Sequence, residues 1–313
     1  MTSYLVTGGA GFIGSHLVEA LVGPGAHVRV LDDFSTGRRE NLAAVSERIE
    51  LLEGDVADPR TAEQAMTGRD VVFHLAAIAS VQASLEDPRR THRVNVDGTL
   101  NVLNAARRAG VRRVVFASST ALYGDHTALP LREGLPSRPL SPYAASKAAG
   151  EMYCTAFHAS YGLPTAALRF FNVYGPRQDP SSPYSGVVSI FAARMTRGER
   201  PVIYGDGKQT RDFVYVADVV QVMLEASQQE EAVGAVFNVA SGRQTSIRQL
   251  AAALNRVLGT DLAPEFAPAR AGEVRYSEGD ASRARAALGW EAMVPLQEGL
   301  ARLIHTEYSR EQR

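Results

Sequence analysis

SYLVTGGAGFIG, residues 3–14, is the stretch that decides the fold. The run Ser3–Thr7 predicts a short buried strand, and the pattern of residues 15–22 predicts a helix. Glycines between them permit a tight turn, let the backbone approach a pyrophosphate and let the helix pack close to the strand. The start of the helix then offers free N–H groups and the positive end of its dipole to phosphates. The glycines in question are Gly8, Gly11 and Gly14.

An acidic residue follows the second predicted strand. This strand spans residues 27–31 and leads into Asp32, which lies 18 residues after Gly14. A carboxylate at this distance binds the adenosine ribose hydroxyls of NAD and repels the additional phosphate of NADP. The glycines, the strand and the acid together predict NAD binding, whereas a purely structural glycine turn does not explain the acid. Arg38 and Arg39 leave NADP open as an alternative.

Strands and helices continue to alternate as far as residue 170. Strands are predicted at residues 49–52, 71–77, 113–117 and 165–170, and helices at residues 59–66, 91–109 and 143–161. This alternation, with almost no hairpin signals, predicts an α/β fold with a Rossmann-type doubly wound parallel sheet. We expect residues 1–170 to form the NAD-binding domain. Residues 171–313 are expected to form mainly a smaller C-terminal α/β substrate lobe, partly interleaved with the first domain.

Polar and small residues fall at the predicted strand ends. Ligands of doubly wound sheets bind beyond the carboxyl ends of the strands. Asp55 and Val56 are expected to bracket the adenine, and Ala76 and Ala77 are small enough to let the backbone approach the middle of the cofactor. Beyond residue 171 the pattern changes: residues 172–186 predict a loop, and residues 188–197, 246–258 and 280–288 predict helices.

The composition excludes several classes of protein. The 313 residues carry a net charge of −1, so no overall field draws the chain to nucleic acid or to a membrane. No apolar run is long enough to span a bilayer. Cys154 is the only cysteine, and no Cys/His cluster has metal-ligand spacing. We therefore expect a cytoplasmic protein without a metal, in which His74 is a packed strand residue rather than a ligand.

Tyr143 and Lys147 stand four residues apart in a predicted helix and so share one face, a turn apart. A neighbouring ammonium favours the phenolate and lowers the pKa of Tyr143 from its usual value near ~10. Tyr143 is therefore the expected proton acceptor as hydride leaves a substrate carbon. Lys147 would also hold the nicotinamide ribose, and Ser119 would hydrogen-bond the reacting oxygen. The alternative is an ordinary amphipathic helix beside an ordinary strand-end serine.

Ordered motifs along nearly the whole chain carry a family resemblance. They are GGAGFIG from Gly8, LDDFSTG from Leu31, GDV from Gly54, HLAA from His74, NVDGTLNVL from Asn95, SSTALYG from Ser118, SPYAASK from Ser141, RFFNVYGPRQDP from Arg169, GDGKQTRDFVYVAD from Gly205 and RAGEVRYSEGDASRARAALGW from Arg270. The chain resembles the extended short-chain dehydrogenase/reductase family, and within it the UDP-hexose 4-epimerases. The resemblance implies a tightly held NAD, oxidation of the sugar at C4, turning of the 4-keto sugar and return of hydride to its other face.

The resemblance also implies which residues bind each ligand. For the diphosphate these are Asn172 and Arg211, assisted by Arg270; Tyr204 would lie beside the uracil and Glu273 would take the uridine ribose hydroxyls. Further substrate contacts are implied for Ser119, Thr120, Val187, Val188 and Ser277. The cofactor set is Gly8, Gly11, Phe12, Ile13, Gly14, Asp32, Asp33, Ser35, Thr36, Gly37, Asp55, Val56, Leu75, Ala76, Ala77, Asn95, Ser118, Tyr143, Lys147 and Phe170.

Local departures from related enzymes narrow the expected reaction. The 4,6-dehydratases of the family carry an Asp-Glu pair where this chain has Thr120 and Ala121, and the UDP-glucuronate decarboxylases use a glutamate at the second position. Ser277 matches a position that is bulky in epimerases confined to unacetylated hexoses. A serine leaves room for an acetamido group, so we expect activity on UDP-N-acetylglucosamine and UDP-N-acetylgalactosamine too. Ala79 stands where some hexose epimerases have a lysine, and this difference argues against an enzyme restricted to glucose and galactose.

Two other functions stay open at this stage. One is another NAD-dependent modification of a nucleotide sugar, by a 4,6-dehydratase or a reductase, and the other is a non-catalytic NAD-sensing protein that kept the fold. The presence of Ser119, Tyr143 and Lys147 argues against the second. By resemblance, the helices at residues 91–109 and 143–161 would pair with those of a second copy as a four-helix bundle in a homodimer.

Overall fold

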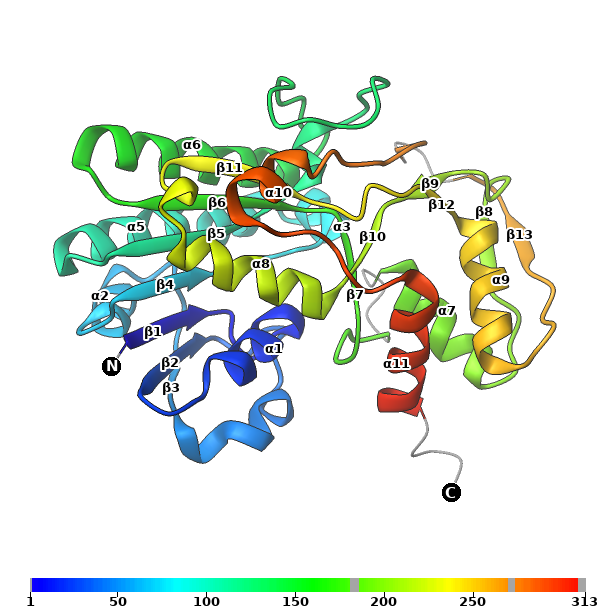
Figure 1. The fold of residues 1–313 in the computed structure, drawn as a ribbon, viewed down its shortest axis with the longest axis horizontal. Helices are drawn as coiled ribbons and strands as arrows, with labels where there is room; N and C mark the ends of the chain where they lie inside the picture. The colour runs from blue at the N-terminus through cyan, green and yellow to red at the C-terminus, as the bar shows by residue number, and fades with distance from the viewer. Residues whose placement is uncertain (1, 181–185, 270–273, 309–313) are drawn as a thin grey trace.

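The centre of the molecule is a seven-stranded sheet. The computed structural model describes residues 2–180, 186–269 and 274–308. The strand order is β11-β6-β5-β4-β1-β2-β3, and every neighbouring pair is parallel (Figure 1). The predicted doubly wound α/β sheet is thus confirmed. Its strands are β1 (Thr2–Thr7), β2 (Ala26–Asp32), β3 (Ile49–Glu53), β4 (Val71–His74), β5 (Arg113–Ser119), β6 (Thr165–Phe170) and β11 (Ala235–Val239).

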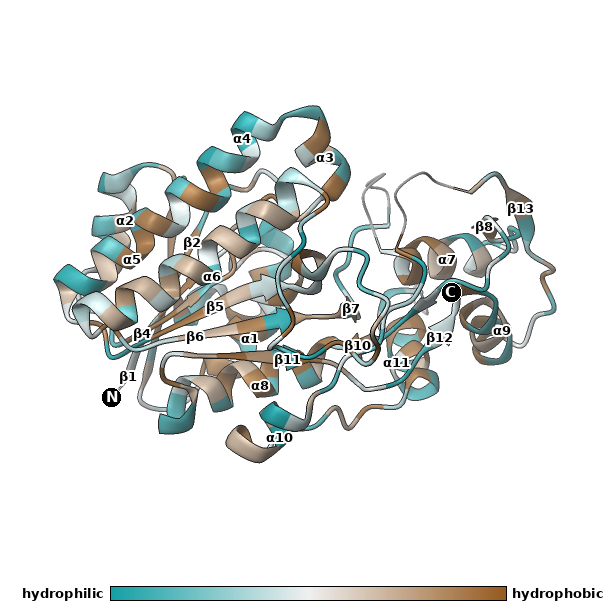
Figure 2. Ribbon diagram, turned by 90° about the horizontal axis from the view of Figure 1, so that it is seen from above, coloured by the Kyte–Doolittle hydropathy of each residue, from teal (hydrophilic) through white to brown (hydrophobic). Residues whose placement is uncertain are grey.

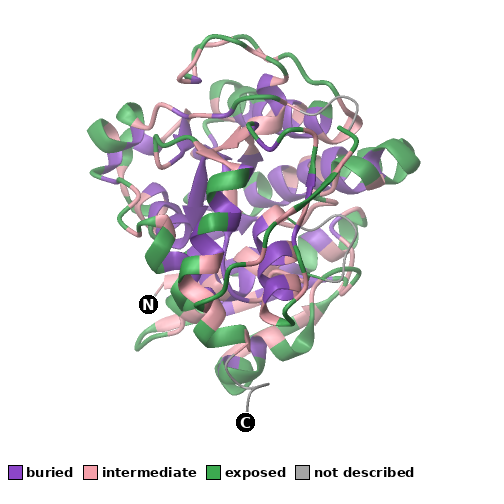
Figure 3. Cartoon of the chain, turned by 90° about the vertical axis from the view of Figure 1, so that its right-hand side faces the viewer, coloured by how far each residue is buried: buried purple, intermediate pink, exposed green. Residues whose placement is uncertain are grey.

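Helices cover both faces of the sheet, and so its strands are apolar on both sides (Figure 2). On β1, Val6 belongs to the core shared with α1 (Phe12–Leu21), α8 (Val216–Gln228) and α10 (Ser282–Leu288). Its neighbour Leu5 belongs to the opposite core, shared with α2 (Pro59–Met66), α5 (Gly98–Ala109) and α6 (Pro142–Tyr161). Figure 3 shows the strands buried beneath helices whose outer surfaces are exposed.

A second lobe lies beyond the carboxyl ends of the strands. Its helices α7 (Val187–Thr196), α9 (Ile247–Leu258) and α11 (Leu296–Tyr308) share a separate core. Three two-stranded sheets accompany them: β7 (Asn172–Tyr174) with β10 (Phe213–Tyr215), β9 (Thr210–Arg211) with β12 (Thr245–Ser246), and β8 (Val202–Tyr204) with β13 (Glu265–Ala267). The division at residue 170 remains a prediction, because the large sheet takes β11 from beyond that point.

The helix predicted at residues 91–109 is interrupted. The structure has α3 (Val81–Glu86), α4 (Pro88–His92), a π-helical turn η2 (Arg93–Asp97) and then α5. A π turn inserts one extra residue per hydrogen bond and is frequent at functional sites. Here it carries Asn95, whose side chain bonds to Ile78 rather than to its own helix. The 3-10 helical segments are η1 (Arg39–Arg48), η3 (Thr120–Tyr123) and η4 (Glu230–Ala232).

Three further expectations need correction. The loop predicted at residues 172–186 contains β7, which forms because Asn172–Tyr174 pairs with β10, far away in sequence. Neither α8 nor β11 was predicted, and β11 joins the large sheet only through its long-range partner β6. The helix expected from residue 280 begins at Ser282, because the Asp280 carboxylate accepts a hydrogen bond from the Ser282 amide.

The part of the chain that the structure describes contains neither a candidate membrane span nor a candidate metal site. None of its helices combines the length and the apolar character needed to cross a membrane. Within residues 2–180, 186–269 and 274–308 no group of three or more His, Cys, Asp or Glu side chains is placed to hold a metal ion.

Candidate active site

The glycine loop is packed too closely for any other residue. Gly8 has a φ of +70°, and a Cβ atom there would lie 2.7 Å from the amide nitrogen of Ala76. A Cβ atom at Gly14 would lie 2.2 Å from the carbonyl oxygen of Gly8, so α1 can pack against the end of β1 only with glycine at this position. Gly11 is the N-cap of α1. The loop therefore leaves backbone, not side chains, facing the space beyond the strand ends.

The start of α1 suits an anion. No side chain among the described residues caps it, and its first turn, which contains Phe12, Ile13 and Gly14, holds no acidic residue. Helix N-termini of this kind bind phosphate through free N–H groups and the helix dipole. The loop and this helix start together fit the pyrophosphate of a dinucleotide.

Asp32 lies at the end of β2, beside the glycine loop. Its carboxylate accepts hydrogen bonds from the amides of Ala10 (2.8 Å) and Phe34 (2.9 Å). Burial raises the pKa of Asp32, and these two amide donors oppose the rise. A Cβ atom at Gly37 would lie 2.8 Å from Asp32 Oδ1, so glycine keeps that side of the carboxylate open. Asp32 is thus placed to bind a pair of ribose hydroxyls.

Residues after Asp32 form an exposed turn. Asp33 accepts hydrogen bonds from the amide and the hydroxyl of Ser35, at 3.0 and 2.7 Å. Thr36 follows and is also exposed. The arrangement turns the chain back over the end of β2, where Arg38 pairs with Asp179 at 2.5 Å.

The next strand ends carry the other predicted cofactor positions. Asp55 accepts a hydrogen bond from the amide of Ala57 (2.8 Å) and forms an ion pair with Arg93 (3.0 Å). Its neighbour Val56 is buried. After β4, the amides of Leu75 and Ala76 donate to the backbone oxygen and the hydroxyl of Thr7, at 3.1 and 3.3 Å. Ala77 is half-buried and Phe170, at the end of β6, is buried.

Asn95 connects this region to the helix of the candidate catalytic pair. Its side chain accepts from the Ile78 amide (2.8 Å) and donates to the Ile78 carbonyl (3.1 Å) and to Ser146 Oγ (2.9 Å). The Ser146 hydroxyl donates in turn to the carbonyl of Tyr143 at 2.7 Å. Asn95 is 2% exposed, so these bonds are shielded from water and fix the first turn of α6.

His74 lies beneath this network. Its two ring nitrogens face the hydroxyls of Thr7 (2.8 Å) and Thr99 (2.9 Å), and the Thr99 hydroxyl also donates to the carbonyl of Asn95. Burial, with a smaller contribution from the charge of Lys147, lowers the pKa of His74 to about 3. The ring is therefore neutral at physiological pH and connects β1, β4 and α5 inside the molecule.

Ser119 and Tyr143 are brought together by β5 and α6. Ser141 caps α6 by accepting from the amide of Ala144 (3.1 Å), and Pro142 occupies the first turn, so Tyr143 stands at a fixed helix start. The side chain of Ser119 lies close enough to the phenol of Tyr143 to lower the phenol's pKa. Burial has the larger effect, and the net pKa of Tyr143 is raised.

The expectation that Lys147 lowers the pKa of Tyr143 is therefore wrong for this structure. The ammonium of Lys147 is buried and donates to the carbonyl of Ala117 at 2.8 Å, so its charge is engaged there. Burial also lowers the pKa of Lys147 itself to about 8. The desolvation of the phenol outweighs the opposing effect of Ser119 on the pKa of Tyr143.

The predicted substrate residues follow the strand ends into the second lobe. Ser119 and Phe170 are register partners on β5 and β6, and Asn172 begins β7 directly afterwards. The amide of Asn172 donates to the carbonyl of Asp212 at 2.9 Å, next to Arg211. Arg211 donates to the carbonyls of Thr210 and Val274.

Other members of the substrate set are spread over the second lobe. Thr120 begins η3, Val187 and Val188 begin α7, and Tyr204 ends β8 with an exposed side chain. Ser277 is 8% exposed. Arg270 and Glu273 lie outside the described residues.

The sequence reasoning missed three buried charged residues. Glu151 and Arg169 form an ion pair of 2.7 Å between α6 and β6, and Asp212 is fully buried beside Arg211. Glu151 stands four residues after Lys147, the same spacing that drew attention to Tyr143. That spacing was the available signal, because a carboxylate one turn from a buried lysine shares its face of the helix.

A family model and several relatives match this geometry. The model of the NAD dependent epimerase/dehydratase family matches residues 4–240. A UDP-glucose 4-epimerase of Mycolicibacterium smegmatis is 45% identical over 96% of each chain. The solved UDP-glucose 4-epimerase of Thermotoga maritima, with UDP-glucose, is 41% identical, covers 99% of both chains and superposes with a TM-score of 0.94.

Relatives with other substrates or reactions are also similar. A UDP-N-acetylglucosamine 4-epimerase from Methanobrevibacter ruminantium, solved with UDP-N-acetylmuramic acid, is 37% identical, covers 100% of this chain and 99% of its own, and has a TM-score of 0.94. UDP-glucuronic acid decarboxylase 1 of Arabidopsis thaliana is 37% identical over 96% of this chain and 68% of its own length. Enzymes named for different reactions, epimerases and a decarboxylase, are thus similar to this chain over most of its length.

Proposed function

Since the chain belongs to the NAD-dependent epimerase/dehydratase family and uses NAD as its cofactor, we propose that it is a UDP-hexose 4-epimerase. The observation that carries the proposal is the close approach of Ser119 to the phenol of Tyr143 at the carboxyl end of β5, one helix turn from the buried Lys147. The similarity to 4-epimerases over nearly the full length supports the same reaction.

The proposed reaction takes a proton and a hydride from the sugar at C4 and returns both with inverted configuration. Tyr143 accepts the proton of the C4 hydroxyl and later gives it back, and Ser119 holds the reacting oxygen next to the phenol. NAD, when bound, supplies the hydride acceptor and the positive charge of its nicotinamide ring. Lys147, with a pKa of about 8, is positively charged at neutral pH and would hold the nicotinamide ribose.

The cofactor positions are proposed from the same geometry. Gly8, Gly11 and Gly14 with the start of α1 would hold the pyrophosphate, and Asp32 would accept from the ribose hydroxyls. A carboxylate at this place disfavours the extra phosphate of NADP. Asn95 would keep the loop at Ile78 and the start of α6 in fixed positions around the cofactor.

The sugar would be anchored by its nucleotide so that the hexose can turn. We propose Asn172 and Arg211 for the diphosphate, because a guanidinium matches phosphate oxygens in charge and shape. Ser277 is small and buried, which suits an N-acetyl group on the sugar. A similar solved epimerase is named for UDP-N-acetylglucosamine, and we therefore include both UDP-N-acetylhexosamines among the proposed substrates.

We also propose that the protein works in the cytoplasm as a homodimer. The outer face of α6 exposes Ala145, Met152 and Ala156, and Met152 is 67% exposed. A surface of small and apolar side chains lets a second helix pack closely. Light scattering of the purified protein tests this: a mass of one chain at micromolar concentration contradicts it.

Incubation with individual UDP-sugars tests the proposed reaction. The protein, with no cofactor added, is given UDP-glucose, UDP-galactose, the two UDP-N-acetylhexosamines or UDP-glucuronate in separate tubes, and the products are separated and their masses measured by mass spectrometry. An epimerase yields an isomer of unchanged mass. Loss of water indicates a 4,6-dehydratase, and with UDP-glucuronate loss of CO2 indicates a decarboxylase; either product without an isomer overturns the proposal. Thr120 and Ala121 stand at the start of η3 after Ser119, and neither supplies a carboxylate for those reactions.

A further inference from the structure

Strand β5 and helix α6 are held together by three successive polar contacts. The carbonyl of Ala117 accepts from Lys147 at 2.8 Å, and the side chain of Ser119 lies next to the phenol of Tyr143. Between them, the hydroxyl of Ser118 donates to the carboxylate of Glu151 at 2.5 Å. Along the helix, residues 143, 147 and 151 are spaced one turn apart. The Ser118–Glu151 contact therefore shares both elements with the candidate catalytic pair.

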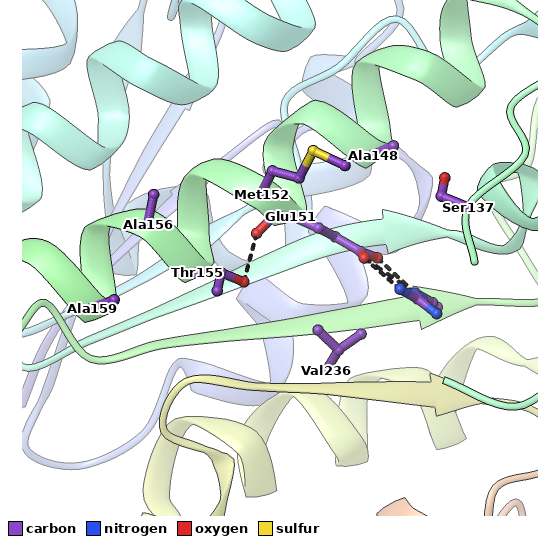
Figure 4. A pocket seen from close by; sticks show the side chains of 9 residues that line it. Ser137, Ala148, Glu151, Met152, Thr155, Ala156, Ala159 and Val236 are labelled. Carbon is purple, nitrogen blue, oxygen red and sulfur yellow. Dashed lines mark hydrogen bonds and ion pairs between the residues drawn. The ribbon is translucent and has the colours of Figure 1, made fainter. Parts of the chain in front are cut away.

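Glu151 is fixed from its other side by Arg169. The guanidinium of Arg169 donates to both carboxylate oxygens, at 2.7 Å from Nη2 and 2.9 Å from Nε, and both residues are buried (Figure 4). Arg169 is the register partner of Ser118 on the neighbouring strand, so Glu151 spans β5 and β6. Arg169 also donates to the hydroxyl of Tyr123 (2.8 Å), so it is itself held in place. A bidentate pair of this kind permits a single geometry.

A buried ion pair adds little net stability to a fold, because removing the two charges from water offsets their attraction. Apolar residues of similar volume often stabilise a fold as well or better. The pair lies beside the outer surface of α6, where Ala148, Met152 and Val236 line a shallow pocket with it (Figure 4). These apolar side chains pack beside the pair, whereas Ser118 and Tyr123 hydrogen-bond to it. What an apolar pair lacks is a negative charge one turn from Lys147.

We propose that Glu151 is a positioning residue: its carboxylate, locked by Arg169, holds β5 against α6 and keeps the ammonium of Lys147 charged and in place. This inference relies on the proposed function for the role of Lys147 and Tyr143. It assigns Glu151 no contact with substrate or cofactor. Glu151 acts on the end of β5 through its hydrogen bond with Ser118, and on Lys147 through its negative charge.

The charges around Lys147 fit this assignment. Burial lowers the pKa of Lys147, and Cys154 and then Glu151 act in the opposite direction; burial also raises the pKa of the Cys154 thiol, so this thiol is uncharged at neutral pH and only Glu151 of the two carries a negative charge. From β4, His74 is neutral at physiological pH, and the ring of Phe116 on β5 lies 5.1 Å from the ammonium. The remaining charged or titratable neighbours are Tyr143 on α6 and Arg169 on β6. Glu151 is thus the carboxylate of the described residues that keeps Lys147 charged.

The test observes Lys147 directly. The chain has only two lysines, Lys147 and Lys208, so protein grown with lysine labelled with carbon-13 at Cε gives two side-chain NMR signals. The Lys208→Arg variant assigns them. The Cε shift is followed from pH 6 to pH 11 in the wild type and in Glu151→Gln. We expect the Lys147 midpoint to fall by about one pH unit in Glu151→Gln, the low end for an opposite charge at short range. The midpoint of the exposed Lys208 should not move.

Two further variants separate positioning from folding. Glu151→Asp keeps the charge, and its Lys147 midpoint is expected to stay near that of the wild type. Glu151→Gln/Arg169→Gln removes both charges, so it folds without a lone buried guanidinium, and its midpoint is expected to remain lowered. An unchanged midpoint in the folded double variant overturns the inference.

Turnover supplies the second measurement. In both variants that lack the carboxylate we expect kcat to fall about tenfold or more, KM to change little, and the alkaline loss of activity to move to lower pH. Wild-type kcat and an unmoved pH profile in the double variant contradict the inference. If the wild type makes no isomer while the midpoint shifts as expected, the proposed function fails and the effect of Glu151 on Lys147 stands.

Discussion

The amide of Gly279 donates a hydrogen bond to the carboxylate of Asp212 over 3.1 Å. Asp212 is fully buried and also accepts from the amide and hydroxyl of Ser241 and from the amide of Gly242, at 2.8, 2.6 and 3.0 Å. It thereby joins three segments of the second lobe at one point. Arg211 precedes Asp212 directly, and Ser277 stands two residues before Gly279. The proposed diphosphate ligand and the proposed sugar-facing serine are thus held at a fixed separation.

This rigidity leads to a prediction about sugar choice. Ser277→Tyr adds a ring at a position that is 8% exposed, within a segment that cannot move away easily. We expect activity on UDP-N-acetylglucosamine to fall at least ~10-fold relative to activity on UDP-glucose, because the acetamido group loses its space. The measurement is the ratio of kcat/KM for the two sugars. Ser277→Ala, which keeps the space, is the control and should preserve the ratio; a ratio equally preserved in Ser277→Tyr would show that this residue does not select the sugar.

A second prediction concerns the proton acceptor. Tyr143→Phe removes only the hydroxyl, and we expect kcat to fall about 10³-fold, within the range for the loss of a general acid–base group. NAD measured after denaturation should equal that of the wild type, because the ring still fills its place. Tyr161→Phe changes an exposed tyrosine of the same helix and is expected to leave kcat unchanged. Full activity in Tyr143→Phe would remove the central assignment.

A third prediction tests the glycine loop. In Gly14→Ala the new methyl would lie 2.2 Å from the carbonyl oxygen of Gly8 and 2.8 Å from Cα of Gly9, so the backbone must shift. Such overpacking costs about 3 kcal/mol of unfolding free energy, and the displaced loop should release NAD. The measurements are urea unfolding and bound NAD. Gly23→Ala is the matched control, because a Cβ atom there meets nothing within 4 Å; equal NAD content in both variants would argue against the loop as the pyrophosphate site.

The sequence predicted the parts of the fold that depend on local pattern. Apolar periodicity, bounded by glycine or proline, correctly indicated the strands at Ser3–Thr7 and Thr165–Phe170 and the helix at Pro59–Met66. Membership of a sheet is a long-range property, and nothing within Ala235–Val239 indicates that it pairs with β6.

The candidate site shows the same division. Residue types and spacings indicated Tyr143, Lys147 and Asp32, but not the balance of burial and charge around them. The pKa of Tyr143 is raised because burial removes the phenol from water, and Ser119 opposes this rise. Arg169 escaped notice because a charged residue in a strand gives no sign in the sequence of being buried, and the one signal for Glu151 was its spacing of four residues from Lys147.

The last prediction concerns acid stability and the neutral ring of His74. Its pKa is about 3 in the folded protein and 6.5 in the unfolded chain, so below pH 6.5 the unfolded state binds the extra proton and gains stability. Stability therefore falls as pH decreases from 6.5 towards 3, and this one group should cost about 2 kcal/mol of unfolding free energy between pH 7 and pH 5. Urea unfolding at the two pH values measures the difference. In His74→Gln, which retains an amide that can reach Thr7 or Thr99, the difference should shrink by that amount although stability at pH 7 is lower. His27→Gln, a change at an exposed histidine, should keep the wild-type difference; an undiminished difference in His74→Gln would mean that the ring is not the group whose protonation opposes folding.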